Sequence, residues 1–240
     1  MGVDFAAELV AQNRAFAELV FGADPQTPVP TCPGWTLKQL YRHVGGGDRW
    51  AAQMVADRMS DVLDFADIRD GRAPQDPDGV RAWLLEGVDL LVDAAAQAGP
   101  DTTVWTFLGP KPASWWIRRR LHEVLVHRAD AAIAVGAAFE VAPAVAADAV
   151  SEWLDIATAR ADFDSTLHLH ATDDGLGEAG EWTVADGTWT HAHGKGDVAL
   201  RGSAPDLLLA LTRRVQLADT SIKLFGDEGT WQSWLSATPF

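Results

Sequence analysis

The chain is poor in cysteine and in positive charge. It has one cysteine, Cys32, in 240 residues, so it cannot form an internal disulfide. Its 19 lysine and arginine residues are outnumbered by 34 aspartate and glutamate residues, which gives a formal net charge of -15. Such an acidic surface repels the phosphates of nucleic acids and of anionic lipids. We therefore expect neither nucleic acid nor a membrane as a partner, and favour a small molecule.

Long apolar segments are also absent from the sequence. Stretches such as residues 129–138 contain an aspartate and are too short to span a bilayer. The first residues lack the cationic start and the unbroken apolar core of a secretory signal. We expect a cytoplasmic protein, a monomer or a weak homodimer, with no transmembrane segment. Its 48% of hydrophobic residues is enough to form a proper core.

Apolar residues in the first two thirds of the chain recur at steps of three and four, the period of amphipathic helices. The sequence predicts helices at about residues 3–21, 36–54, 80–98, 112–136 and 144–160. Thr36 and Gln39 have the spacing of a capping box, and Pro112 suits the first turn of the fourth helix. Four such helices joined by loops form an antiparallel four-helix bundle. The fifth helix either packs on that bundle or bridges to the C-terminal part of the chain.

After residue 160 the sequence alternates between apolar and polar residues, as β-strands do. Strands are predicted at residues 167–171, 181–184, 188–193, 197–201 and 221–225. Asp186-Gly187 indicates a hairpin, and further helices are expected from Pro205 and around Trp231. The fold class is therefore α plus α+β. A helical domain over residues 1–160 precedes a smaller α+β domain over residues 161–240.

The most informative pattern is the pair Glu123 and His127 on the predicted fourth helix. A spacing of four residues places both side chains on one face, about one turn apart. A carboxylate and an imidazole that face a core are two of the three protein ligands of an open catalytic zinc site. His122 lies about 100° around the helix from Glu123 and is left outside the ligand set.

A purely structural interpretation of the same pattern stays open. Glu123 has arginines at positions 119, 120 and 128 as possible ion-pair partners, and it would then be a solvated helix charge. His127 would simply pack in the core. The same arginines, with Arg118, form the main basic cluster of the chain and could instead bind the carboxylates of an anionic substrate.

Two segments of the sequence carry a family resemblance. Residues 31–36 read TCPGWT and are followed by His43, and residues 122–130 read HEVLVHRAD. Together they resemble the mycothiol-dependent maleylpyruvate isomerase family, a branch of the DinB-like four-helix metalloenzymes. The resemblance covers nearly the whole chain, including the C-terminal stretch 168–234. It implies a DinB-like helical bundle followed by a smaller domain.

By this resemblance the metal ligands are His43, Glu123 and His127. The metal would be a divalent ion such as zinc, and mycothiol would be the thiol cosubstrate. Family members also use an arginine of the C-terminal domain in catalysis. Arg213 and Arg214, at the end of the leucine-rich helix, are the nearest matches, although the Gly-Arg ending typical of the family is absent here.

The resemblance implies an enzyme in which a metal-activated thiolate adds to an electrophilic small molecule. Expulsion of the thiolate would make the reaction a cis-trans isomerisation, and its retention would make it an S-transfer. Two other functions stay open: a hydrolase that uses metal-bound water, and a non-enzymatic protein whose tryptophans line a cavity for a ligand. A set of three protein ligands favours a catalytic over a structural metal site, because structural zinc is usually held by four protein groups.

Cysteine and the strand histidines are two further candidates for function. Cys32 lies in a proline-flanked loop just before the helix of His43, and we interpret it as a small buried residue because nothing nearby activates its thiol. The pairs His168/His170 and His191/His193 each project to one face of a predicted strand. They could meet as a four-histidine metal site, but histidines beside polar turns usually face solvent.

Overall fold

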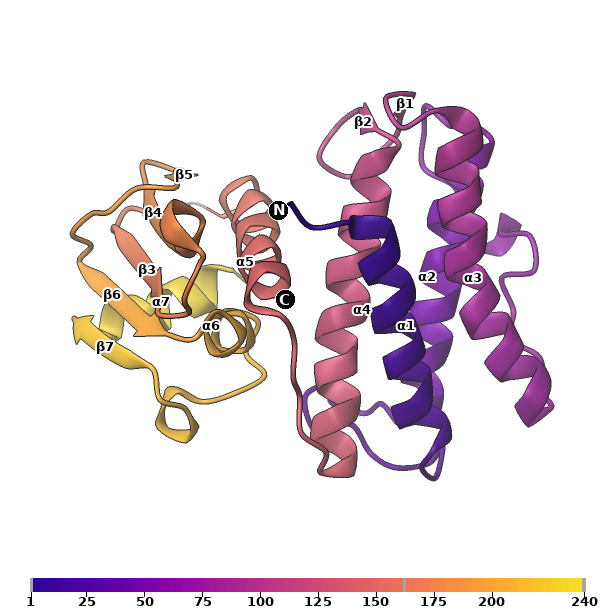
Figure 1. Cartoon of the computed structure of the whole chain (residues 1–240), viewed down its shortest axis with the longest axis horizontal. Helices are drawn as coiled ribbons and strands as arrows, with labels where there is room; N and C mark the ends of the chain where they lie inside the picture. Colours follow the sequence, from indigo (N-terminus) through magenta and orange to yellow (C-terminus); the bar gives the residue numbers. More distant parts are fainter. Residues whose placement is uncertain (1, 162, 239–240) are drawn as a thin grey trace. The chain divides into compact units, whose positions relative to one another are not determined.

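The computed structural model of the chain describes residues 2–161 and 163–238. The chain divides into two compact units between Phe139 and Glu140. The first unit is helical with one short hairpin, and the second combines a five-stranded sheet with helices (Figure 1). The fold class expected from the sequence is confirmed. Within the described ranges, none of the helices has both the length and the apolar character that crossing a bilayer requires.

Four helices lie side by side in the first unit (Figure 1). They are α1 Phe5–Phe21, α2 Leu37–Ala56, α3 Pro77–Ala98 and α4 Ser114–Val135. Helices α1 and α2 each pack on both α3 and α4. Each of the four contributes fully buried apolar side chains, among them Leu9, Leu40, Leu84 and Leu121. The core of the unit therefore lies between the helices, as their amphipathic patterns predict.

Polar side chains start three of these helices. Asp4 accepts a hydrogen bond from the backbone N–H of Ala7 at 3.1 Å, and Asp76 caps α3 in the same way. The capping box predicted for α2 is confirmed, since Gln39 Oε1 accepts from the backbone N–H of Thr36 at 2.7 Å. These caps satisfy backbone groups that the first turn leaves without helical partners.

The fourth helix begins two residues after Pro112, near which its start was predicted. Pro112 belongs to a small antiparallel hairpin of β1 Thr103–Val104 and β2 Lys111–Pro112. Helix α4 begins at Ser114, whose backbone N–H donates to the carbonyl of Pro100 at 3.0 Å. A proline is tolerated in so short an edge strand because its nitrogen need not donate to a neighbour. The local signal for a helix start was therefore overridden by pairing with another segment.

The second unit is built on a sheet with the strand order β5-β4-β3-β6-β7. Its strands are β3 Leu167–Ala171, β4 Glu181–Ala185, β5 Thr188–Thr190, β6 Val198–Gly202 and β7 Lys223–Gly226. Its helices are α5 Pro143–Thr158, α6 Ala204–Leu211 and α7 Glu228–Ala237. Strands β3 and β6 are parallel, and the other pairs are antiparallel. Helix α5, which the sequence prediction grouped with the helical domain, packs on α6 and β5 of the second unit.

The two faces of this sheet differ. On one face, the indole N–H groups of Trp182 and Trp189 donate to side chains of α5, at 2.8 Å to Ser151 Oγ and 2.9 Å to Asp155 Oδ1. The alternate residues of β3 and β4, including His168, His170 and Glu181, point to the other face. Helix α5 therefore covers one face, and polar side chains collect on the other.

The hairpin predicted at Asp186-Gly187 is confirmed, but the strand after it is shorter than predicted. Both turn residues have positive φ, 51° and 68°, as a two-residue type I′ turn requires. Strand β5 ends at Thr190, so His191 and His193 lie in the connection to β6 and not on a strand. The chain must leave β5 there, because β6 lies beyond β4 and β3 in the sheet.

Three consecutive glycines in α2 allow close packing. A Cβ at Gly45 would overlap the ring of Trp83 from α3, and a Cβ at Gly47 would lie 2.7 Å from Arg120 Nη1 of α4. Gly46 differs from both, because the nearest atom to a Cβ there would be a carbonyl oxygen at 3.9 Å. Two of the three glycines are therefore needed for contacts of α2 with its neighbours.

This difference predicts opposite effects of the same substitution on stability. Gly45→Ala should lower the free energy of unfolding by about 1–3 kcal/mol, because the added methyl group displaces the Trp83 ring. Gly46→Ala should raise it by about 0.5–1 kcal/mol, since alanine loses less backbone entropy in a helix. Urea denaturation of the two variants and the wild type measures both effects. Equal destabilisation by both substitutions would contradict the packing described for α2.

Candidate metal centre

Three side chains from two helices converge in the first unit. His43 of α2 places Nε2 3.0 Å from Oε1 of Glu123, and His127, one turn after Glu123 on α4, places Nε2 3.8 Å from the same oxygen. One potential ligand atom from each residue lies within 4.8 Å of the others. Ligand atoms around a tetrahedral zinc ion are about 3.4 Å apart, given bonds of about 2.1 Å. The three groups are therefore spaced as ligands that can share one ion.

A buried carboxylate orients His127. Asp130 is fully buried, and its Oδ2 lies 2.8 Å from Nδ1 of His127. Its other oxygen accepts a hydrogen bond from Thr31 Oγ1 at 2.6 Å. With Nδ1 held in this way, Nε2 is the nitrogen that faces Glu123 and His43. A histidine held by a carboxylate through its second nitrogen is the usual arrangement for a metal ligand.

Two arginines keep Glu123 ionised. Arg119 forms an ion pair with Oε2, and Arg120 Nη1 lies 3.4 Å from Oε1. Burial raises the pKa of Glu123, but these two guanidinium groups, together with hydrogen bonds from His127 and His43, outweigh it and hold the pKa well below its usual value. The side chain is only 16% exposed, so it is not the solvated helix charge of the structural interpretation. Glu123 has its arginine partners and the two histidines at the same time.

Arg120 also joins the two helices that carry the site. Its Nε donates to Asp48 Oδ1 of α2 at 2.8 Å, and Nη2 donates to the carbonyl of Val44 at 3.1 Å. Both charged groups are buried. Burial raises the pKa of Asp48 while Arg120 opposes that shift. Removing one partner of such a buried pair costs about 3–5 kcal/mol, because the other charge is then left buried and unpaired.

The group of His43, Glu123 and His127, called the cluster below, opens toward solvent on the side of His43. The side chain of His43 is 42% exposed, whereas that of His127 is 6% exposed. The Trp35 ring lies beside His43, with the ring centroids 5.1 Å apart. The histidine rings of the cluster are 5.0 Å apart and nearly perpendicular. A small molecule can therefore approach the three groups from one direction.

Comparison with known proteins identifies the family. The family model described as the mycothiol maleylpyruvate isomerase N-terminal domain matches residues 6–132, and the model of the C-terminal domain of that family matches residues 144–233. The chain belongs to the mycothiol maleylpyruvate isomerase family. This assignment confirms the resemblance carried by residues 31–36 and 122–130. None of the curated proteins matches the chain.

Solved structures of the same family have the same fold. Two crystal structures of a mycothiol-dependent maleylpyruvate isomerase, one of them of a histidine-to-alanine mutant, match with a TM-score of 0.67 each. Their sequence identities to this chain are 15% and 16%. Each match covers 92% of this chain and 91% of the other. The likeness at this identity concerns the fold alone, and the family assignment rests on the domain models.

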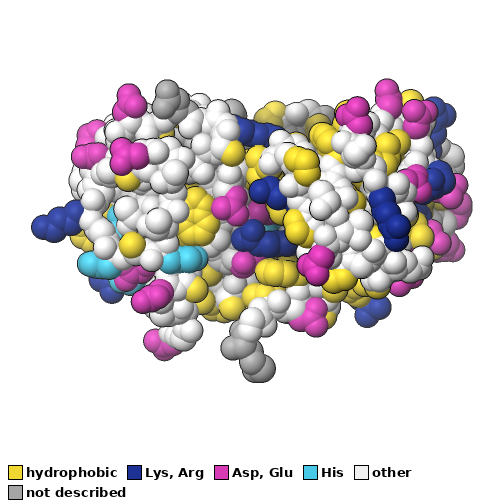
Figure 2. All heavy atoms as spheres, turned by 90° about the horizontal axis from the view of Figure 1, so that it is seen from above, with side chains coloured by type: hydrophobic (Ala, Val, Ile, Leu, Met, Phe, Trp, Pro, Cys, Tyr) yellow, Lys and Arg dark blue, Asp and Glu magenta, His cyan; other side chains and the backbone are white. Residues whose placement is uncertain are grey.

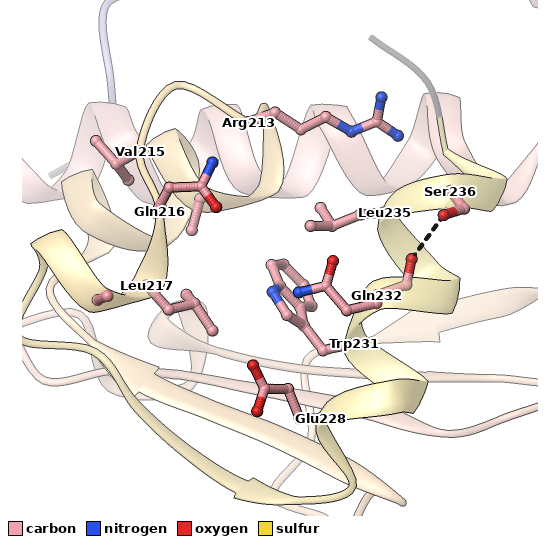
Figure 3. Close-up of a pocket in the computed structure, with 11 residues that line it drawn as sticks. Arg213, Val215, Gln216, Leu217, Glu228, Trp231, Gln232, Leu235 and Ser236 are labelled. Carbon is pink, nitrogen blue, oxygen red and sulfur yellow. Dashed lines mark hydrogen bonds between the residues drawn. The ribbon is translucent and has the colours of Figure 1, made fainter.

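The two predicted catalytic arginines lie in the second unit, after α6. Arg213 has a φ of 62° and donates through Nη2 to the carbonyl of Thr238 at 3.1 Å. It lines, together with Trp231 and other residues of α7, a cavity of about 610 Å³ (Figure 3). Arg214 is buried and donates through Nη1 to the carbonyl of Thr212 at 2.6 Å.

Cys32 lies closer to the cluster than the sequence indicates. The sequence predicts a small buried residue, but Cys32 is half-exposed, and its Sγ is 3.4 Å from Oδ2 of Asp130. Its sulfur and ligand atoms of His127 and Asp130 lie within 4.8 Å of one another. No spacing in the sequence could reveal this contact, because Cys32 and Asp130 are 98 residues apart and meet only when the loop packs on α4.

His122 and two of the tryptophans considered from the sequence pack against other side chains and lie outside the group of candidate ligands. His122 is buried and packs edge-on against the ring of Phe5 from α1, outside the cluster. Trp116 and Trp50 pack on each other, with ring centroids 5.3 Å apart. Their indole N–H groups donate to backbone carbonyls, at 3.0 Å and 2.8 Å. Among the tryptophans that the structure describes, Trp35 lies against a residue of the cluster.

The geometry predicts which substitutions remove a metal ion. His43→Ala and His127→Ala should each lower the metal content by one ion per chain, because two ligands cannot hold a divalent ion tightly. Asp130→Asn should retain the ion with affinity lower by about 10–100-fold, since the orientation of His127 is loosened. Elemental analysis and competition with a chelator measure these effects. Arg14→Ala, an exposed change on α1, is the control, and unchanged metal content in both histidine variants would refute the ligand set.

Metal binding should also release a proton. Burial lowers the pKa of His127, but hydrogen bonds with Asp130, Cys32 and Glu123 outweigh it and raise the pKa to about 10. The metal-free imidazole is therefore protonated at neutral pH, and Nε2 must lose its proton to accept an ion. Metal affinity should rise with pH up to about 10. Calorimetry at pH 7 in buffers of different ionisation enthalpy should show about one proton released per ion from this residue.

Proposed function

We propose that the chain is a metal-dependent enzyme that uses a low-molecular-weight thiol, mycothiol, as the nucleophile against an electrophilic small molecule. The observation that carries this proposal is the convergence of His43, Glu123 and His127 within 4.8 Å at a partly exposed site. Membership of the mycothiol maleylpyruvate isomerase family supports the choice of thiol and of reaction class. The reaction would be a cis-trans isomerisation or an S-transfer.

The ligand set favours a divalent ion of the zinc type. Two imidazoles and one carboxylate are the protein ligands of many catalytic zinc sites, and they leave coordination positions for other molecules. His43, Glu123 and His127 would hold the ion. When bound, the ion would supply a Lewis acid that lowers the pKa of a thiol enough to deprotonate it near neutral pH.

The charges around the cluster suit an anionic reactant. Glu123 contributes one negative charge, and the guanidinium groups of Arg119 and Arg120 lie against it. These two cations offset the carboxylates of Glu123 and Asp48, so a thiolate or a carboxylated substrate that enters from the side of His43 meets little repulsion. Arg119 is partly exposed and could also donate to a substrate carboxylate.

The thiolate would act by addition and elimination. Addition to a conjugated double bond converts it to a single bond, which can rotate, and the electrons move to a neighbouring carbonyl as an enolate. Return of those electrons expels the thiolate and gives the trans product. Protonation of the enolate carbon would instead retain the sulfur and give an S-transfer product. The two outcomes share the nucleophile and differ only in whether the carbon–sulfur bond breaks.

By the resemblance to the family, one arginine at the end of α6 would take part in catalysis. Arg213 adopts a left-handed backbone conformation, with a φ of 62°, which favours glycine. The family pattern at this position is Gly-Arg, so Arg213 stands where the glycine is expected. We therefore assign the role of the family arginine to Arg214 and not to Arg213.

The two other functions are less well supported by the site. A hydrolase needs a base beside the metal, but Asp48 is held by Arg120, and Asp130 is held by His127 and Thr31. A structural metal would need a fourth protein ligand. Cys32 groups with His127 and Asp130 rather than with the other two candidate ligands, so it does not complete that set.

The thiol hypothesis predicts a spectroscopic change. In the cobalt-substituted protein, mycothiol should shift the visible absorption of the metal and add a sulfur-to-metal charge-transfer band. The same addition to cobalt-treated His127→Ala should have no effect. Turnover of a panel of conjugated electrophiles should require both thiol and metal. A metal-loaded protein with no spectral change and no thiol-dependent turnover would favour the hydrolase or the binding protein instead.

A further inference from the structure

The open face of the sheet in the second unit carries a group of histidines. His168 and His170 alternate along β3, and His170 is paired in register with Glu181 of β4. His193, from the connection between β5 and β6, reaches the same carboxylate. Figure 2 shows histidine side chains (cyan) gathered beside acidic groups on the surface of this unit. Three imidazoles thus surround one carboxylate.

The distances suit metal coordination. Oε2 of Glu181 lies 3.4 Å from Nε2 of His168 and 2.8 Å from Nδ1 of His193, and Oε1 lies 3.7 Å from Nδ1 of His170. Ligand atoms of His168, Glu181 and His193 all lie within 4.8 Å of one another. These values are close to the separation of about 3.4 Å expected between ligands of a tetrahedral ion.

The connection that carries His193 is built to lie close to the sheet. Thr183 Oγ1 donates to the carbonyl of Ala192 at 2.9 Å, and a Cβ at Gly194 would lie 2.7 Å from that hydroxyl. A Cβ at Gly196 would meet backbone atoms of both neighbouring strands, at 2.5 Å from the carbonyl of Val198. The two glycines thus allow the close approach that brings His193 to Glu181.

We propose that His168, Glu181 and His193 form a second site for a divalent transition-metal ion of the zinc, nickel or copper class. Imidazole nitrogens favour these metals over magnesium and calcium, which prefer oxygen ligands. His170 stands on the side of the site next to Arg201 of β6, with which it pairs in register, so we assign it a supporting position. This proposal is independent of the function proposed above.

The site has room for a further ligand. A cavity of about 190 Å³ borders it and is lined by residues that include Glu178, Glu181 and His193. The side chain of His168 is 8% exposed, whereas that of His193 is 80% exposed. His168 is thus a buried ligand within the sheet, and His193 is an exposed ligand at the surface. Such a site should bind its ion reversibly and more weakly than the cluster of the first unit.

His191 provides a matched control. It lies two residues before His193 in the same connection, but its Nδ1 is 2.9 Å from the backbone carbonyl of Glu181 and not from the carboxylate. Its ring packs against Trp189, with the centroids 5.0 Å apart. His191→Ala therefore removes an exposed histidine from the same segment without removing a proposed ligand.

The experiment is a zinc titration of the full-length chain carrying His127→Ala, which removes the first site. Zinc should bind at one ion per chain in competition with a chromogenic indicator. Adding His193→Ala or Glu181→Gln should weaken that binding by at least about tenfold, and adding His191→Ala should not. His193 is exposed, so its loss should leave the thermal unfolding of the metal-free chain unchanged.

A second measurement locates the ion. Zinc should shift the imidazole NMR signals of His168 and His193 in the His127→Ala chain, and Glu181→Gln should reduce the metal content of the otherwise unchanged protein by one ion. The absence of a bound ion in the His127→Ala chain, or equal binding in the His193→Ala, Glu181→Gln and His191→Ala forms, would overturn the proposal. Neither result would bear on the ligands of the first unit.

Discussion

The buried ion pair between Arg120 and Asp48 is the interaction on which the geometry of the candidate metal centre depends. It joins α2 to α4, the helices that supply His43 on one side and Glu123 on the other. The guanidinium packs where Gly47 has no side chain, and it also reaches the carboxylate of Glu123. The guanidinium group of Arg120 therefore both joins the two helices and keeps the candidate ligand Glu123 ionised. Its position explains why polar groups occupy this part of the core.

Only part of this site could be predicted from the spacing of residues in the sequence. The spacing of Glu123 and His127 predicts two groups on one helical face, because a helix is a local structure. The contact of His43 with Glu123 spans 80 residues and depends on packing, so only the family resemblance pointed to it. The approach of Cys32 to Asp130 spans 98 residues and had no signal in the spacing. The residue types of the site could be named from the sequence, but contacts between residues far apart in the chain could not be predicted from their spacing.

The same limit applied to the fold. Capping and turn signals, as at Thr36 and Asp186-Gly187, were borne out because they act within a few residues. Pro112 satisfies the rule for a helix start, yet it pairs in a hairpin with a strand earlier in the chain. The end of β5 at Thr190 follows from the strand order of the sheet, which alternation along one segment does not encode.

Asp130 links a surface loop to the orientation of a buried imidazole. Thr31, Cys32 and His127 all hydrogen-bond to its two oxygens. The loop of residues 28–36 is itself closed by the hydrogen bond from the Val29 N–H to the Trp35 carbonyl. The loop and the imidazole are therefore both hydrogen-bonded to the same carboxylate. Alkylation of the half-buried thiol would therefore disturb the carboxylate that orients the imidazole, although Cys32 belongs to a different segment of the chain.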